Sequence, residues 1–251
     1  SGFVTQVGTR TGRGGVYRAI HSDGKHKWFT QLGIGLFGDH TESRSGGNLA
    51  RGIDMPIDYT GPHQLQISYN PSPNWDYYAG KTYRNMRHNF GMSVRPSGMV
   101  TVEMEGSVGG TVDYANARQA DQVRIGPSLG LKLGRSLSAT LSHSYQKLNV
   151  DERRLFTANL TEVRAVYYIS SRMFVRAIAQ FTNIDRNPAL YTYSVPERTR
   201  QLFSQFLFSY KLNPQTVALM GYSDSARGDQ TIDVTRTDRT FFVKLGYAWL
   251  P

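Results

Sequence analysis

Near its C-terminal end the chain reads Phe241-Phe242-Val243-Lys244-Leu245-Gly246-Tyr247-Ala248-Trp249. Side chains of a β-strand point alternately to its two faces. One face of this stretch would therefore carry Phe241, Val243, Leu245, Tyr247 and Trp249, and the other Phe242, Lys244, Gly246 and Ala248. The same period of two recurs in residues 99–108, 123–132 and 137–146, and no stretch keeps apolar residues at helical spacing. The sequence thus predicts an all-β protein.

The length of the alternating segments indicates which solvent the strands face. They run for about 9 to 13 residues, whereas strands of soluble sandwiches average about 5 to 6. A tilted strand needs about 9 to 11 residues to cross a bilayer. The face opposite the apolar residues is rich in Gly, Ser and Thr with occasional charges, which is typical of a barrel interior. We therefore expect a transmembrane up-and-down antiparallel β-barrel of about fourteen strands, or part of a larger barrel.

Fourteen strands are expected near residues 2–10, 14–22, 27–37, 63–70, 75–83, 88–96, 98–109, 121–133, 137–148, 158–169, 173–183, 200–211, 215–224 and 236–250. The connections alternate between long and short over most of the chain, with long ones at 38–62, 110–120, 149–157, 184–199 and 225–235. Outer-membrane barrels have short periplasmic turns and longer external loops. The pattern predicts a bacterial outer-membrane location, and an even strand count predicts that both termini are periplasmic.

Composition narrows the function classes. The chain has 251 residues, no cysteine, a net charge of +10 and a mean hydropathy of −0.43. It has no disulfide framework, no cysteine nucleophile and no apolar run of about 18 residues that could form a membrane-spanning helix. Basic residues are scattered through predicted loops and inner faces rather than clustered among aromatic residues, so no nucleic-acid partner is expected. Lipopolysaccharide phosphates and outer-membrane lipid are the partners that such loop cations fit.

Two sets of residues are candidates for function. Aromatic side chains near strand ends are typical of a girdle at the lipid headgroups, although tyrosine also simply favours strands; these are Trp28, Trp75, Tyr77, Tyr145, Tyr167, Tyr210, Tyr247 and Trp249. Charged residues fall on the predicted inner face, namely Glu103, Glu105, Arg124, Lys132, Glu162, Arg164, Arg176, Lys211 and Lys244. In an open lumen this cationic excess would favour anions. In a plugged barrel the same residues would pair with one another or with the plug.

Motifs of catalysis lack the structural context that they need. The residues Gly33-Ile34-Gly35-Leu36-Phe37-Gly38 match a dinucleotide-binding string, but they lie in a predicted strand. Ser144 and Lys147, three residues apart on a strand, would point to opposite faces, and adjacent His143 diverges from Ser144. The acidic residues Asp224, Asp229, Asp233 and Asp238 could gather around Ca²⁺, with solvated loop charge as the simpler alternative. The sequence predicts no cofactor, no metal site and no enzymatic activity.

Several C-terminal segments, 156–164, 183–188, 210–216, 221–224 and 238–247, resemble the closing strands of a family of bacterial outer-membrane proteins, catalogued as domain of unknown function 5916. The opening Ser1-Gly2-Phe3-Val4 resembles a segment from the middle of that domain. In the family, a signal peptide and a carbohydrate-binding family 9-like module precede the barrel. The resemblance implies that residues 1–251 are the C-terminal portion of a longer protein.

The last strand partly resembles the assembly signal of outer-membrane barrels, through Lys244, Gly246, Tyr247 and Trp249. It differs from that signal in ending with Leu250-Pro251 instead of an aromatic residue. This resemblance implies the barrel assembly machinery as a partner.

The expected function is that of a membrane anchor, pore or passage for small solutes. The alternative is a surface binding module whose loops at 38–62, 184–199 and 225–235 capture glycans or a partner protein. An outer-membrane hydrolase is a third possibility, for which the sequence offers no nucleophile.

Overall fold

The computed structural model describes residues 8–24, 28–213 and 215–248. Within these ranges the protein is all-β, with fourteen strands and two short 3-10 helices, Pro62–Gln64 and Pro188–Leu190. Neither of these helices has the length or the apolar character to cross a membrane.

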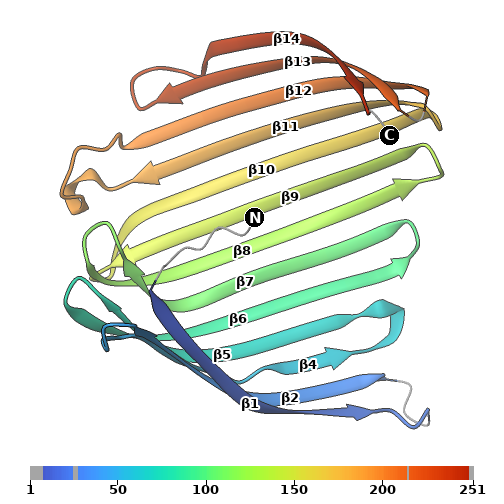
Figure 1. The fold of residues 1–251 in the computed structure, drawn as a ribbon. Coiled ribbons are helices and arrows are strands. Elements are labelled where there is room, and N and C mark those ends of the chain that lie inside the picture. Colours follow the sequence, from blue (N-terminus) through green and yellow to red (C-terminus); the bar gives the residue numbers. More distant parts are fainter. Residues whose placement is uncertain (1–7, 25–27, 214, 249–251) are drawn as a thin grey trace. The chain divides into compact units, whose positions relative to one another are not determined.

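Consecutive strands are neighbours in one antiparallel sheet, as Figure 1 shows for β5 to β14. The order is β1-β2-β3-β5-β6-β7-β8-β9-β10-β11-β12-β13-β14, and β4 pairs with β2 and β5. The bounds are β1 Thr9–His21, β2 Gln31–Ser43, β3 Asn48–Asp54, β4 Ile57–Thr60, β5 Gln66–Tyr78, β6 Lys81–Ser97, β7 Val100–Asp113, β8 Arg118–Leu133, β9 Leu137–Val150, β10 Arg153–Ser170, β11 Met173–Arg186, β12 Arg198–Asn213, β13 Thr216–Asp229 and β14 Thr235–Tyr247. The predicted all-β, up-and-down antiparallel arrangement is confirmed.

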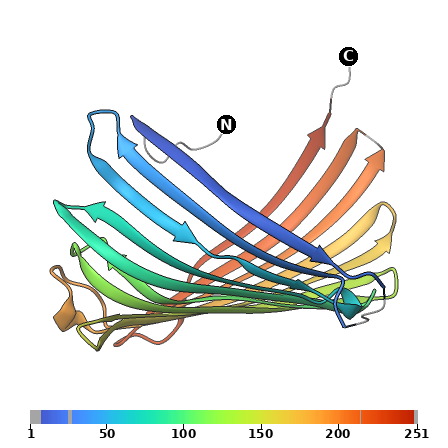
Figure 2. The ribbon, with the colours of Figure 1, turned by 90° about the horizontal axis from the view of Figure 1, so that it is seen from below.

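The chain divides into two compact units. Unit 1 comprises residues 1–94, 104–125 and 148–153, and unit 2 comprises residues 95–103, 126–147 and 154–251. Unit 1 contains β1 to β5 and most of β6, and unit 2 contains most of β10 and all of β11 to β14. The long ladders of β11 to β14 are visible in Figure 2.

The eight strands expected from residue 98 onward are all present, and most of them extend further than the sequence predicts. The connection expected at 149–157 is wrong: only Asp151 and Glu152 separate β9 from β10. Both residues have positive φ, 48° and 61°, which is the geometry of a type I′ hairpin turn. The turn escaped prediction because Asp151 is followed by Glu152 and not by the glycine that this geometry favours at the second position.

The N-terminal strands differ from the prediction in three places. The strands expected at 14–22 and at the end of 2–10 form one strand, β1, while residues 2–7 lie outside the described part. The loop expected at 38–62 instead contains the end of β2 together with β3 and β4. The three strands expected at 63–70, 75–83 and 88–96 are two, β5 and β6. The count of fourteen is therefore right only because these errors cancel.

Strand β5 passes through Pro71 and Pro73, which the sequence placed in a turn. A proline within a sheet is tolerated where no ladder partner needs its missing N–H. The carbonyl of Pro71 accepts a hydrogen bond from the amide of Met55, so this edge of β5 faces the break between β3 and β4. Both prolines have their nitrogen on that edge because alternate residues of an antiparallel strand direct their backbone groups to the same neighbour. The break between β3 and β4 thus accommodates the two prolines of the neighbouring strand β5.

Strands β3 and β4 follow one another in the same direction between β2 and β5. The fourteen described strands consequently occupy thirteen rows of the sheet order. The expected position of both termini on the periplasmic side rested on an even number of membrane crossings, and it stays a prediction.

Candidate functional site

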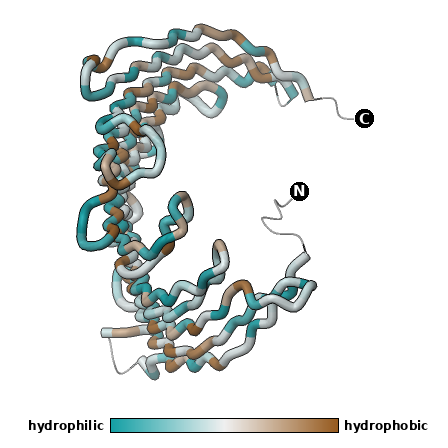
Figure 3. Tube along the Cα trace, turned by 90° about the vertical axis from the view of Figure 1, so that its left-hand side faces the viewer, coloured by the Kyte–Doolittle hydropathy of each residue, from teal (hydrophilic) through white to brown (hydrophobic). Residues whose placement is uncertain are grey.

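In unit 2 the strand register assigns each side chain to one of two faces, since residues directly opposite in adjacent strands share a face. Tyr222 lies opposite both Phe206 and Phe241, and Met220 opposite Phe208 and Val243. We call this the apolar face of unit 2, and it carries Val163, Tyr167, Phe181, Leu202, Phe206, Tyr210, Met220, Tyr222, Phe241, Val243, Leu245 and Tyr247. Figure 3 shows apolar and hydrophilic residues alternating along the strands that lead to the C-terminus.

Both units expose large apolar side chains to an extent that is unusual for a water-soluble protein. The side chains of Val243 and Leu245 are 71% and 69% exposed, and Val16 of unit 1 is 72% exposed. Polar Asn85 of unit 1 and Ser209 of unit 2 are buried, at 3% and 5%. Each exposed large apolar side chain forgoes about 1.5–3 kcal/mol of burial free energy in water. Within the described residues nothing covers these apolar positions.

Five of the nine charged candidates share the opposite, polar face of unit 2. The register places Glu162 opposite Gln180, and Arg176 between Val166 and Leu207. Lys211 and Lys244 lie on the same face, opposite Val217 and Leu219. Arg164 contacts Glu162 at 3.4 Å, and Arg176 donates to the Oε1 of Gln205 at 3.0 Å. Three of the five charged candidates on this face, Glu162, Arg164 and Arg176, are thus held by hydrogen bonds or an ion pair.

The other four charged candidates lie on β7 and β8 and are all exposed. A Cβ atom at Gly106 would meet the ring of Phe90, so the adjacent Glu105, and Glu103 two residues before it, point to the other face of β7. Arg124 belongs to unit 1 and Lys132 to unit 2. No ion pair joins any of these four to another residue in the part of the chain that the structure describes. Their role in a lumen stays a prediction.

The expected girdle residues fall into separate groups. Tyr167, Tyr210 and Tyr247 lie on the apolar face of unit 2. Tyr167 and Tyr210 are close to the ends of β10 and β12, and Tyr247 lies opposite Thr216 at the start of β13. Tyr145 is half-buried on β9, on the same side as His143, which contacts the Thr161 hydroxyl at 2.8 Å. In unit 1, Trp75 and Tyr77 share one face of β5, and Trp28 stacks on Tyr59 at 6.3 Å. Trp249 lies outside the described residues.

In unit 1 a carboxylate that the sequence did not single out organises the polar face. Asp54, at the end of β3, accepts hydrogen bonds from Asn70 at 3.1 Å and Ser72 at 2.7 Å, and an ion pair from Arg13 at 3.3 Å. The register places Asp54 opposite Phe37, on the face that also carries Gly35 and Tyr17. We call Asp54, Arg13, Asn70 and Ser72 the Asp54 cluster. It joins β1, β3 and β5 across the break in the β3–β4 row.

A second polar chain crosses β5, β6, β7 and β8 on the same face of unit 1. Buried Asn85 donates to Asp76 at 2.9 Å and accepts from Gln119 at 2.7 Å. Arg87 donates to the Thr111 hydroxyl at 3.3 Å. Buried polar side chains that are mutually hydrogen-bonded specify one arrangement of the strands that carry them. The sequence missed both groups because the strands that carry Asp54, Ser72 and Arg87 were expected to be loop or turn.

Acidic residues at the strand ends of unit 2 are held by local partners. Arg198 binds Asp185 at 2.7 Å and lowers the pKa of that carboxyl, with Asn183 as a second donor. The amides of Thr231 and Ile232 lower the pKa of Asp229. Asp224 pairs with Arg236 at 2.7 Å. Among the described residues no group of three or more acidic, histidine or cysteine side chains could hold a metal ion, so the Ca²⁺ alternative gains no site there.

The motifs considered for catalysis lie within strands. Gly33, Gly35 and Gly38 all belong to β2, and the dinucleotide-binding string requires a strand-to-helix turn. Ser144 and Lys147 both belong to β9, where a separation of three residues places them on opposite faces. Their arrangement offers no nucleophile with a neighbouring base.

The chain matches no protein-family model and no curated protein sequence. Among solved structures it is similar to OmpT, an outer membrane protein of Vibrio cholerae, with 9% identity and a TM-score of 0.48 over 94% of this chain and 89% of that chain. The in-vitro folded form of OmpT gives 7% identity and a TM-score of 0.45 over 96% and 97%. The NanC porin gives 11% identity and a TM-score of 0.36 over 80% and 94%. Identities and scores this low establish neither a shared function nor a correspondence of residues.

Proposed function

We propose that the chain forms the wall of a bacterial outer-membrane β-barrel that serves as a passage for small polar solutes. Lipid contacts the apolar face of unit 2 and the apolar face of unit 1, which carries Val16, Leu36, Ile34 and Ile57. The polar faces line the passage. The observation that carries this proposal is the exposure of large apolar side chains on one face of each unit, among them Val16, Val243 and Leu245. Lipid is the solvent in which such apolar exposure costs nothing.

The dimensions of the apolar face support the proposal. From Leu202 to Tyr210 the apolar positions of β12 extend over about 27 Å of strand. At a tilt of about 40° they rise about 20 Å across a bilayer, which is most of the apolar band of about 25 Å that outer-membrane barrels present. Beyond this band the same face of unit 2 carries Arg200 and Arg198, in the position where lipopolysaccharide phosphates would lie.

The polar faces support a passage rather than a dry core. The Asp54 cluster and the Asp76–Asn85–Gln119 chain supply carboxylate, amide and hydroxyl groups, and the Oδ1 of Asn74 is buried without a hydrogen-bond partner among the described residues. Such groups can exchange hydrogen bonds with a hydroxylated or charged solute. On this proposal the protein is not an enzyme and needs no cofactor.

Conductance and gel mobility test the proposal together. The full chain, inserted in a planar bilayer, should give discrete conductance steps, and an unboiled sample should migrate differently from a boiled one on a denaturing gel. If the protein inserts and is heat-modifiable but gives no conductance, it forms a membrane wall and is not a passage. Solubility without detergent, with the same mobility boiled and unboiled, would reject both.

A second candidate function rests on the connection between β11 and β12. This loop, residues 187–197, begins with the 3-10 helix Pro188–Leu190 and places the ring of Tyr193, which is 55% exposed, 5.8 Å from that of Tyr191. Exposed aromatic rings of this kind bind glycans or a partner protein. The Tyr193→Ala variant should lose capture while conductance is retained, and unchanged capture would reject the loop as a binding site. Of the other two loops proposed for capture, 38–62 is mostly strand, and 225–235 is reduced to residues 230–234.

We also propose, from the segments quoted in the sequence analysis, that the chain is the C-terminal part of a protein of the family that it resembles. Its last strand would then be recognised by the barrel assembly machinery. Replacing Tyr247, which is 62% exposed at the end of β14, with Ser should slow assembly in cells and leave refolding in detergent unchanged. Equal assembly of the two proteins in cells would reject recognition through this strand.

A further inference from the structure

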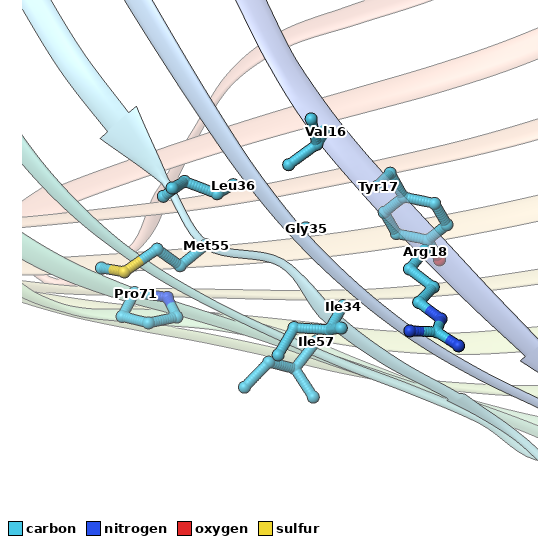
Figure 4. A pocket seen from close by; sticks show the side chains of 9 residues that line it. All are labelled: Val16, Tyr17, Arg18, Ile34, Gly35, Leu36, Met55, Ile57 and Pro71. Atoms are coloured by element: carbon cyan, nitrogen blue, oxygen red, sulfur yellow. The ribbon is translucent and has the colours of Figure 1, made fainter.

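A groove of about 520 Å³ opens on the apolar face of unit 1, beside the break between β3 and β4. Val16 and Leu36, which lie opposite one another on β1 and β2, form one part of its wall. Ile34 and Ile57, also directly opposite, form another, and Met55 and Pro71 close it toward β5. Figure 4 shows these side chains around Gly35. Its volume is within the range of about 300–1,000 Å³ that is typical of ligand sites.

The groove exists because one row of the sheet is interrupted. Between Asp54 and Ile57 the chain leaves the ladder, and the amide of Gly35 donates to the carbonyl of Pro56 at 2.9 Å instead of to a regular strand. Pro71, on the facing edge of β5, offers a ring in place of a long side chain. The break in the ladder thus contributes to the depression, and the side chains on either side of it form the walls.

A single cation marks one side of this apolar groove. Arg18 lies opposite Ile34 on the apolar face, and in Figure 4 it stands beside Ile34 and Ile57, away from Met55 and Pro71. No carboxylate among the described residues pairs with it. Two residue pairs further along the ladder, Tyr59 lies opposite Leu32 and donates a hydrogen bond to the carbonyl of Trp28. Aromatic rings of this kind mark the headgroup level of a membrane.

We propose that this groove binds one phospholipid, with an acyl chain along Val16, Leu36 and Met55 and its phosphate against Arg18. The inference rests on the proposed function, because the groove faces lipid only if the apolar face does. A guanidinium forms charge-assisted hydrogen bonds with phosphate oxygens, and at the headgroup level it can do so without entering the hydrocarbon. Arg18 would thus select anionic phosphatidylglycerol over neutral phosphatidylcholine.

The choice of phospholipid over lipopolysaccharide follows from the charge of the groove. Arg18 is the one charged side chain among the nine described residues that line it, and one guanidinium matches the single phosphate of a phospholipid, whereas lipid A carries two phosphates. This match commits the groove to a phospholipid.

Native mass spectrometry of the full chain in mild detergent tests the groove. The protein is offered phosphatidylglycerol and phosphatidylcholine in equal amounts, and separately lipid A. Arg18→Gln should lower the phosphatidylglycerol adduct about fivefold, the effect of one basic side chain at a lipid surface. Arg10→Gln, on the same face of β1 but outside the groove, is the matched control and should change nothing. Val16→Trp should remove the adducts of both lipids, whereas Ile20→Trp should keep them.

The outcomes separate this inference from the proposed function. Equal lipid binding by the parent and the Arg18→Gln protein, or equal losses in the Arg18 and Arg10 variants, would overturn the groove while leaving a heat-modifiable, inserted wall intact. Preferential capture of lipid A would reject the phospholipid assignment. If the parent protein does not insert into bilayers at all, the proposed function itself is wrong. The gel mobility of each variant, boiled and unboiled, reports insertion independently of lipid binding.

Discussion

Tyr17 lies across Gly33 on the polar face of unit 1, in the space that a Cβ atom at residue 33 would occupy. The Tyr17 hydroxyl then donates to Asp58 of β4 at 3.0 Å. We expect Gly33→Ala to displace the ring and break this bond, at a cost of about 1–3 kcal/mol for an overpacked site. Urea unfolding of the refolded protein measures the loss.

The matched control for this variant is Gly14→Ala, because a Cβ atom at Gly14 would meet nothing within 4 Å. It should leave the urea midpoint unchanged or raise it slightly, since alanine restricts the unfolded chain. If Gly33→Ala were as stable as the Gly14 variant, Tyr17 would not be held where the structure places it.

Ion preference should follow the charge at residue 176. The Arg176 guanidinium lies on the polar face of unit 2 and donates to Gln205 at 3.0 Å. In the series Arg, Gln and Glu at this position, the permeability ratio of anions to cations should fall stepwise and severalfold, because a lumen charge attracts its counter-ion. Reversal potentials in a salt gradient across a planar bilayer give the ratio. An identical ratio in all three proteins would remove Arg176 from the passage.

Acid should weaken the attachment of the β11–β12 loop. Asp185 lies at the loop end of β11, beyond the apolar band, and Arg198 lowers its pKa below the ordinary 3.8. A carboxyl whose pKa is lower in the folded state stabilises that state above its unfolded pKa. This contribution is lost as pH falls through the lowered folded pKa. The thermal midpoint should therefore drop by a few degrees between neutral pH and pH of about 2.

The Asp185→Asn protein should have a lower midpoint at neutral pH and a smaller drop in acid, whereas Asp121→Asn, at an exposed carboxyl on β8, should behave like the parent. Parallel pH profiles for the parent and Asp185→Asn would show that the Asp185–Arg198 pair does not contribute to stability.

A cation on the apolar face should obstruct membrane insertion. Phe241 and Thr240 are neighbours on β14, and the register places Phe241 opposite Tyr222 and Thr240 opposite Ser223. Phe241→Arg should cost about 2–4 kcal/mol in lipid vesicles, the penalty for arginine near the bilayer midplane. Thr240→Arg, one residue away on the polar face, should be tolerated. Urea titration in vesicles compares the two, and equal penalties would mean that the faces do not differ in their solvent.

The sequence is sufficient to predict the strands of the C-terminal half because local pattern and ladder agree there. One face of each of β11 to β14 carries apolar residues at most alternate positions, and short connections precede β11 and β13. In the N-terminal half the decisive information is nonlocal. Pro71 and Pro73 are compatible with β5 only because the facing row is broken at Met55 and Pro56. No pattern within residues 66–78 reveals a break in residues 48–60.

The candidate site is likewise predictable from the sequence in the C-terminal half and not in the N-terminal half. Alternation alone places Glu162, Arg164 and Arg176 on one side of their strands, and the register then groups them with Lys211 and Lys244. Asp54 could not be found in this way, because its partners Arg13 and Asn70 come from strands 41 and 16 residues away in sequence. The polar cluster is a product of strand pairing, and only the register reveals it.

We propose that lipid covers the apolar face and that the polar face does not contact lipid. Because the chain has no cysteine, single cysteines can be introduced from residue 201 to 210 of β12 and spin-labelled without background. In lipid vesicles, collision with oxygen should be high at 202, 206, 208 and 210 and low at 201, 203, 205 and 209, with a period of two residues. Uniform accessibility, or oxygen maxima at Gln201 and Gln205, would contradict the account.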